Sequence, residues 1–564
     1  MKKNIIKTTI FATLCCLMSS CFGDLDTMPL DDNQVVSEQV YTTVDGYNGM
    51  LAKCYGNLIL TGQKGGDGGD GDLEGANEGY SSYVRLMFYL EELNSDNFIM
   101  PSSSNGLRKM LDLQWDASNA SVIRWTYQRL YMGIAYCNEM IRECTEAKLK
   151  SRGLWDELGS ECASYNAEAR FIRAYCYATL CDLFGSVPYI DENTGVKDIP
   201  TQWTRKQIFE YAESELKAIE NDLKAPGQNV YGRVDRAADW FLLARMYLNA
   251  ETWIGENRYT DALTYAKKVI DDGHYPLAKD YRQIFNADND QCSEIIWPLV
   301  QDGEYAQSSG GTNFYVKAFV NGPMNSLFVT GVGTRGWGNV RSKTNLVDAF
   351  DADDVAFDTN DTWGDQKKDK RAQFMTALDG QTKETWDANG EMTKTFTCGY
   401  GYIKWRNVTN DNQIPAQGDA YTSIDFPMFR TADAYLMAAE AILRGASGGS
   451  QADALAYVNE VRERAYMSGK YAKAGVRSDV SGDITASELT LDFLMAERQR
   501  ELASEICRRT DLIRFGKYTK GYNWDFKDAE RNGKDVDDKY KLMPIPSTEF
   551  SNNPGLVQND GYDK

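Results

Sequence analysis

Residues 496–516 read AERQRELASEICRRTDLIRFG, and this stretch dominates what the sequence says about the fold. Glu497, Glu501 and Glu505 recur every four residues, which places three carboxylates on one ridge of a helix. Gly516 follows the last apolar residues, and arginines occupy the turns before it, where a helix dipole favours positive charge. The pattern predicts a single helix that ends at Gly516.

Arginines of the same stretch are expected to neutralise these carboxylates. Arg498, Arg508 and Arg509 lie close enough along such a helix to pair with them. Ion pairs on a helix are usually structural, so the carboxylates are interpreted as scaffold groups and not as catalytic ones.

Four motifs, in this order along the chain, resemble those of one known family. FPMFRTADAYLMAAEA at 426–441 is similar to its F-P-x-x-R-x-A-D-x-x-L-x-x-A-E-A helix, and residues 497–516 fit E-R-x-x-E-L-x-x-E-x-x-R-x-x-D-L-x-R-x-G. LMPIP at 542–546 and NPGLVQNDGY at 553–562 look like its closing segments. On these motifs the chain resembles the SusD/RagB family, lipoproteins that capture nutrients on the outer membrane of Gram-negative bacteria.

The first residues predict export and lipidation. Three lysines precede the apolar run 8–18, which is too short to span a bilayer and has the layout of a secretory signal peptide. MSSC at 18–21 is similar to a lipobox, so residues 1–20 are expected to be removed and Cys21 to be lipidated. Residues 21–40 then form an acidic tether, which in this family resembles a signal for display on the outer surface. The expected location is the cell outer membrane, with the chain held by lipid and exposed at the surface.

Charge and composition limit the kinds of ligand. The chain has 61 Lys and Arg against 82 Asp and Glu, a net charge of −21, and no polybasic block, so nucleic acid is excluded as a partner. Aromatic residues make up 12% of the chain, and their flat rings suit the faces of neutral sugars as well as a protein core.

The sequence offers little for catalysis or metal binding. His274 is the only histidine and lies in DDGHYP, which reads as a loop at the end of a helix. The cysteines are spread through helical stretches with no C-x-x-C pair, which favours buried free thiols. Asp67, Asp70 and Asp72 in a Gly-rich run could hold calcium, but their spacing does not match an EF-hand. We therefore expect no metal site, no cofactor and no enzymatic activity, with calcium at this run as the lesser alternative.

Apolar periodicity predicts a mainly α-helical protein. Helices are expected at residues 121–146, 166–184, 204–223, 235–250, 259–270, 429–443, 452–466 and 490–515. Consecutive amphipathic pairs of this kind are typical of tetratricopeptide-like repeats, which bury their faces only by stacking. The predicted parts are a helical region 41–279, an irregular lobe with minor strands at 280–424, and a helical region 425–564.

Ligand residues are implied by the resemblance. EGYSSYVR at 78–85 and ELNSD at 92–96 look like segments of the glycan-binding branch, in which the residue matching Arg85 helps to bind sugar. A Trp often follows the second segment, but here FIMPSSSN at 98–105 has none, and Asn105 offers an amide instead. GWGN at 336–339 and KWRN at 404–407 match two more segments near the ligand. The predicted site is Arg85, Asn105, Trp337, Asn339 and Arg406.

The resemblance implies a glycan-binding protein that captures oligosaccharide and passes it to a SusC-like TonB-dependent transporter, over which it lies as a lid. A peptide-binding partner of such a transporter is one alternative, and the missing Trp favours it. A surface glycoside hydrolase is the other, because the 82 acidic residues could supply a carboxylate pair.

Overall fold

The computed structural model of the chain describes residues 37–62, 71–195, 197–325, 327, 330–332, 336–392, 396–416, 418 and 420–564. The predicted signal peptide, the lipidation site Cys21 and most of the acidic tether lie outside these residues, as do Asp67 and Asp70 of the proposed calcium run. None of the described helices combines the length and the apolar composition that a membrane span requires.

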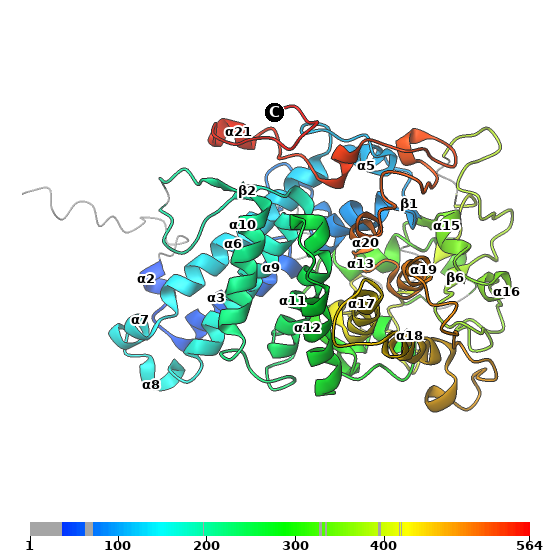
Figure 1. The fold of residues 1–564 in the computed structure, drawn as a ribbon, viewed down its shortest axis with the longest axis horizontal. Helices are drawn as coiled ribbons and strands as arrows, with labels where there is room; N and C mark the ends of the chain where they lie inside the picture. Colours follow the sequence, from blue (N-terminus) through cyan, green and yellow to red (C-terminus); the bar gives the residue numbers. More distant parts are fainter. Residues whose placement is uncertain are drawn as a thin grey trace, which may run out of the picture.

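Long helices stack side by side in the N-terminal half of the protein (Figure 1). They are α6 (Ser121–Glu143), α9 (Cys162–Phe184), α10 (Arg205–Ile219), α11 (Arg236–Ile254) and α12 (Tyr259–Asp272). Each packs on the next in the chain, and α3 (Val44–Ile59) covers α6. This succession confirms the predicted helical hairpins.

Local signals set the helix ends. Thr204 and Gln207 form a capping box at the start of α10, and the Asp235 carboxylate accepts the backbone N–H groups of Ala237 and Ala238 at the start of α11. The helix predicted at 121–146 ends at Glu143 because Thr145 begins a new helix, α7 (Glu146–Ser151), by accepting the N–H of Lys148. A short α8 (Trp155–Leu158) follows before α9.

A second helical group continues the stack. It consists of α17 (Thr431–Leu443), which packs on α12, and of α18 (Gln451–Tyr466), α19 (Leu491–Leu502) and α20 (Arg508–Arg514). Shorter helices are α2 (Ser37–Val40), α4 (Tyr83–Phe88), α5 (Leu107–Asp112) and α21 (Glu549–Asn552), and a π-helical turn, Tyr89–Leu93, follows α4. The C-terminal segment runs along one edge of the molecule beside α5 (Figure 1).

The prediction of one helix over residues 496–516 is wrong. The chain leaves the helix at Ala503 and re-enters one at Arg508, with φ of 67° at Ser504 and 54° at Ile506. The carboxylate of Glu92 accepts the backbone N–H groups of Ser504 at 3.3 Å and Cys507 at 3.4 Å, so the interrupted backbone is satisfied from a distant part of the chain. Trp405 adds a hydrogen bond from Nε1 to the Ser504 hydroxyl, at 2.9 Å.

The predicted ion-pair partners are also wrong, because the carboxylates are bound by Arg500 of the stretch and by basic residues outside it. Glu501 is wholly buried and accepts from Arg371, Arg430 and Arg464. Burial alone would raise the pKa of Glu501, but these guanidiniums outweigh it and hold the pKa at about 2. The other two carboxylates are bound likewise: Glu497 by Arg371, Arg462 and Arg500, and Glu505 by Lys404 and Arg430.

The arginines expected to pair within the helix instead tie the stretch to other elements. Arg498 binds Asp433 of α17 at 2.7 Å, and Arg508 binds Asp96 at 2.7 Å. Arg509 donates to Glu91 at 3.4 Å. The stretch is therefore a central buried junction, and its charges join segments about 400 residues apart in sequence.

Strands are few and short. β4 (Ile295–Leu299), near the start of the predicted lobe, pairs antiparallel with β8 (Phe426–Arg430), just after its end, in one buried ribbon. The other antiparallel pairs are β1 (Phe98–Ile99) with β5 (Arg341–Ser342), β2 (Val187–Pro188) with β3 (Gln202–Trp203), and β6 (Phe374–Met375) with β7 (Gly401–Tyr402). The described residues of the lobe also form α13 (Thr312–Lys317), α14 (Gly322–Asn325), α15 (Thr344–Val347), α16 (Ala352–Val355) and 3₁₀ turns at Tyr281–Phe285 and Asn289–Gln291.

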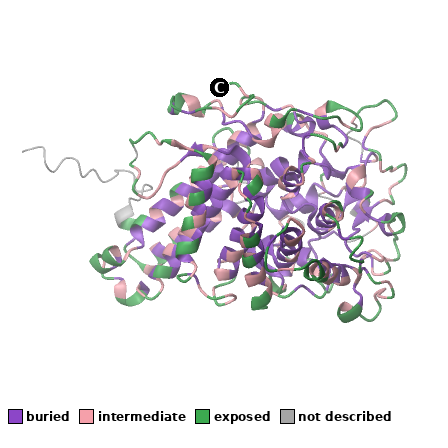
Figure 2. Ribbon diagram, in the orientation of Figure 1, coloured by how far each residue is buried: buried purple, intermediate pink, exposed green. Residues whose placement is uncertain are grey.

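One large core runs through the helical stack and into the lobe, with a smaller cluster around α17 and α18. In Figure 2 the facing sides of the helices are buried and the outer loops exposed. The described cysteines are free thiols, buried or half-buried as expected, and His274 lies in an exposed loop.

Candidate ligand-binding site

Arg85, on α4, is held between aromatic rings. Its guanidinium carbon lies 4.0 Å from the centre of the Tyr80 ring and 4.7 Å from that of Phe314. Its Nε donates to the Tyr89 hydroxyl at 2.6 Å. The residue is only 6% exposed, and stacking together with the hydrogen bond fixes the plane of the guanidinium.

Trp337 comes from the lobe and meets this arginine. Its ring centre is 5.6 Å from the Arg85 guanidinium and 6.4 Å from the Phe314 ring, yet 38% of the residue stays exposed. Its backbone N–H donates to the carbonyl oxygen of Lys317 in α13. We call Tyr80, Arg85, Phe314 and Trp337 the Arg85 cluster.

Glycines on both sides of Trp337 explain its exposure. A Cβ at Gly336 would lie 2.6 Å from the carbonyl oxygen of Val320, and Gly338 has a φ of +60°. The backbone of residues 336–338 can therefore pack closely against α13 and the residues after it, and the Trp337 ring remains on the outer side. The sequence predicted both Arg85 and Trp337, and the fold brings them together across about 250 residues.

A loop that the sequence did not single out lies beside the Arg85 cluster. Residues 301–311 turn at Asp302, whose carboxylate accepts the N–H of Glu304 at 2.9 Å and of Ala306 at 3.1 Å. A Cβ at Gly310 would be 2.1 Å from the Gly79 carbonyl oxygen, so the loop packs directly on the segment that leads to α4. On this loop Tyr305 is 82% exposed. A tyrosine within a run of Gly, Ser and Asp was the signal available in the sequence.

The other predicted residues are placed differently. Asn339 is half-buried two positions after Trp337, and its backbone N–H donates to Ala318 at 2.8 Å. Asn105 is half-buried in a 3₁₀ turn, Ser104–Gly106, with φ of 57°, and Gly106 there packs against Ala120 at the start of α6.

Arg406 is built into the lobe instead. It is 3% exposed, its guanidinium carbon lies 3.8 Å from the centre of the Trp363 ring, and Nη1 donates to the Thr362 carbonyl at 3.3 Å. Burial, with a smaller effect of Arg282, lowers the pKa of Arg406 to about 9. No contact between described residues joins this guanidinium to the Arg85 cluster.

Segment 98–105, which has no Trp, also contributes no exposed aromatic ring, because Phe98 is 0% exposed. Met100 follows β1 and is 2% exposed, so it provides no stacking surface. Trp337 is an exposed aromatic ring beside Arg85, and Tyr305 is a second exposed ring, on the loop 301–311 that packs on Gly79.

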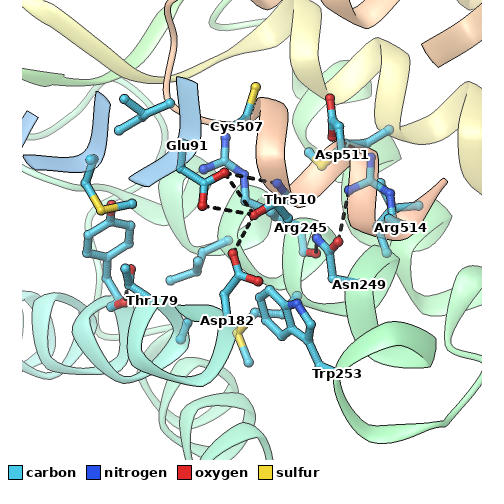
Figure 3. Close-up of a pocket in the computed structure, with 18 of the residues that line it drawn as sticks. Glu91, Thr179, Asp182, Arg245, Asn249, Trp253, Cys507, Thr510, Asp511 and Arg514 are labelled. Carbon is cyan, nitrogen blue, oxygen red and sulfur yellow. Dashed lines mark hydrogen bonds and ion pairs between the residues drawn. The ribbon is translucent and has the colours of Figure 1, made fainter. Parts of the chain in front are cut away.

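A cavity of about 70 Å³ lies elsewhere, between α9, α11 and α20 (Figure 3). There the Thr510 backbone N–H donates to Glu91 at 3.0 Å, and Arg514 donates to Asn249 at 2.9 Å. Burial raises the pKa of Glu91 to about 8, against the effect of Arg509. The cavity has room for a few water molecules and none for an oligosaccharide, and the polar groups labelled there hold helices together.

Among the described residues, no group of three or more His, Cys, Asp or Glu side chains is arranged so that it could bind a metal ion.

Comparison with known proteins gives consistent matches. Residues 293–562 match the model of the SusD family, and residues 74–248 match a model described as starch-binding associating with outer membrane. The starch-binding protein SusD of Bacteroides thetaiotaomicron is 32% identical, over 99% of both chains.

Solved structures agree with the fold. A SusD superfamily protein from Bacteroides vulgatus aligns with a TM-score of 0.67 at 17% identity, over 93% of this chain and 100% of that one. Surface glycan-binding protein A from Bacteroides thetaiotaomicron, in complex with laminarihexaose, aligns with a TM-score of 0.63 at 21% identity, over 92% and 99%.

Proposed function

Because the chain belongs to the SusD family, we propose that it binds an oligosaccharide at the cell surface through the Arg85 cluster and Tyr305. The observation that carries the proposal is Trp337, a large ring left 38% exposed beside a fixed and nearly buried guanidinium. A relative named for starch binding and a neighbour in complex with laminarihexaose support a glycan as the ligand class.

The chemistry of the cluster fits a neutral sugar. A pyranose presents C–H groups to an aromatic face and hydroxyl groups at its rim, so it needs a ring to stack on and polar groups beside it. Trp337 supplies the ring, while Arg85 and Asn339 supply groups at its edge, and Tyr305 extends the aromatic surface. Asn105 and Arg406 complete the proposed set, and Arg406 also stacks on Trp363 within the lobe.

Membership of this family makes the chain a binding protein and not an enzyme. The surface glycoside hydrolase, considered above as an alternative, would release new reducing ends from an oligosaccharide. Incubation of the purified protein with maltohexaose and laminarihexaose should leave the number of reducing ends unchanged.

We further propose that the protein is anchored in the outer membrane through lipidated Cys21 and delivers its ligand to a SusC-like TonB-dependent transporter. The family model described as associating with outer membrane supports the location. Two acyl chains or more would hold a protein that has no membrane-spanning helix among its described residues. Replacing Cys21 by Ala should abolish labelling by an acyl probe in cells, and a label retained by the variant would refute this anchor.

A peptide ligand is the second candidate, because residues 98–105 contain no Trp, which the resemblance to the glycan-binding branch led us to expect there. Calorimetric titration separates the two. Maltohexaose or laminarihexaose should bind the wild type, and Trp337→Ala should bind about tenfold more weakly, which corresponds to about 1.4 kcal/mol and the energy expected of one aromatic contact.

Two further variants sharpen this titration. Arg85→Lys keeps the charge but loses the stacked planar guanidinium, so it should also weaken binding. Ile199→Ala is the control, because Ile199 is 67% exposed on the loop between β2 and β3 and its loss should leave the affinity unchanged. Equal affinity of Trp337→Ala and wild type would refute the stacking role, and binding of peptides but of neither hexasaccharide would favour the second candidate.

A further inference from the structure

Two cysteines meet where α6 ends and α9 begins. Cys144 is the residue after the last turn of α6, and Cys162 is the first residue of α9. Their Sγ atoms are 3.9 Å apart. We propose that Cys144 and Cys162 are a disulfide-forming pair, closed by exchange with an oxidant that itself carries a disulfide, such as oxidised glutathione or a thiol–disulfide oxidoreductase.

The backbone already places the two side chains correctly. The Sγ of each cysteine lies 3.7 Å from the backbone carbonyl oxygen of the other, so the two main chains approach one another from both sides. An S–S bond is about 2.05 Å long, and rotation about the Cα–Cβ bonds can bring the sulfur atoms to that distance. We infer that the bond can close by local adjustment where α6 ends and α9 begins.

The two cysteines differ in exposure and in thiol pKa, and both differences favour Cys162 as the first to react in thiol–disulfide exchange. Cys162 is 9% exposed and Cys144 is 2% exposed, so Cys162 is the thiol that an oxidant reaches first. The hydrogen bond donated by the Cys144 thiol lowers the pKa of Cys162 below its usual value, although burial acts in the opposite direction. A larger thiolate fraction makes Cys162 the better attacking group.

The reaction balances as two exchanges. The Cys162 thiolate attacks one sulfur of the oxidant and displaces the other as a thiolate, which leaves a mixed disulfide. Cys144 then loses its proton to solvent and attacks the Cys162 sulfur, displacing the second thiolate. Two protein thiols are oxidised, and one oxidant disulfide is reduced to two thiols.

The bond would link the two ends of the segment 145–161, which contains α7 and α8, at the edge of the helical stack. Residues 145–161 hold α7 and α8, which reach the core through Leu149 and Leu158 and are otherwise largely exposed. A cross-link that closes this loop restricts the unfolded chain, so the oxidised protein should resist unfolding more than the reduced one.

Another thiol pair provides an internal comparison. Cys54 and Cys137 face each other between α3 and α6, and both are 0% exposed. An oxidant in solution cannot reach either of them while the protein is folded. The proposal is therefore specific: oxidation of the native protein should link Cys144 to Cys162 and leave Cys54 and Cys137 as thiols.

The test maps cysteines in the folded protein without reduction. The purified protein is incubated with oxidised glutathione, its free thiols are blocked with N-ethylmaleimide, and it is digested with trypsin. Cleavage after Arg142, Lys148, Arg152 and Arg170 yields peptide 143–148, which contains Cys144, and peptide 153–170, which contains Cys162. The expected product is these two peptides joined, with a mass lower than their sum by two hydrogen atoms.

Variants and a melting curve complete the test. Cys292→Ser removes a more accessible thiol and should keep the cross-link, whereas Cys162→Ser should lose it. Oxidised wild type should melt at a higher temperature than reduced wild type, and Cys162→Ser should show no such difference. Recovery of both wild-type peptides unlinked, or joined to other cysteines, would overturn the proposal whatever the variants do.

Discussion

Glu501→Gln tests the buried junction on which the helical stack and the lobe converge. Glu501 is 0% exposed and accepts from Arg430 at 2.7 Å, from Arg371 at 3.0 Å and from Arg464. Glutamine keeps the shape but leaves three guanidiniums with one negative charge fewer in a dry environment. Removing one partner of a buried ion pair costs about 3–5 kcal/mol. The pKa gives a similar figure: a folded pKa of about 2 against an ordinary 4.5 corresponds to about 3 kcal/mol.

The assay is urea unfolding of both proteins between pH 7 and pH 2. Because the folded pKa of Glu501 is depressed, its contribution is fully present above the unfolded pKa and is lost as pH falls toward 2. The variant should therefore be less stable by about 3 kcal/mol at pH 7, and this difference should shrink as the pH falls. Glu146→Gln, which removes an exposed pair with Lys150, should change stability by less than about 0.5 kcal/mol. A variant as stable as wild type at pH 7, or a difference that does not shrink in acid, would refute the reasoning.

Three further predictions concern single side chains. Asp239 is 0% exposed, both of its carboxylate oxygens are without a hydrogen-bond partner among the described residues, and burial raises its pKa well above the usual value. Because the folded pKa of Asp239 is raised, the stability of the wild type should fall as pH rises above about 4. Asp239→Asn should therefore melt at a higher temperature than wild type at pH 8, and its melting temperature should depend less on pH between pH 5 and 8. An unchanged melting profile would contradict this. Trp405→Phe removes the hydrogen bond to the Ser504 hydroxyl where the helix is interrupted, and should lower the free energy of unfolding by about 1–2 kcal/mol in urea titrations; an unchanged free energy of unfolding would contradict this. Tyr305→Ala should weaken binding of a hexasaccharide in calorimetry without changing the melting temperature, because an 82% exposed ring adds little to the core; a lower melting temperature with unchanged affinity would show the opposite role.

The helical part of the fold was predictable because its signals are local. Apolar spacing and caps such as Thr204 and Asp235 act within a few residues, and they located α6, α9, α10, α11 and α12 to within a turn or so. Motif resemblance then identified the family, and within the site it predicted Arg85 and Trp337. The fold places the guanidinium of Arg85 beside the ring of Trp337.

Only the tertiary structure decided the rest, because the forces involved act between distant residues. Helix periodicity predicted an unbroken helix through Ser504. Glu92, 412 residues away, supplies the acceptor that satisfies the Ser504 backbone N–H where the helix is interrupted. The same limit hid the partners of Glu501, the exposure of Tyr305 and the burial of Arg406. Sequence spacing determines which face of an element a side chain occupies, whereas its partner and its contact with water depend on which other segments pack against that face.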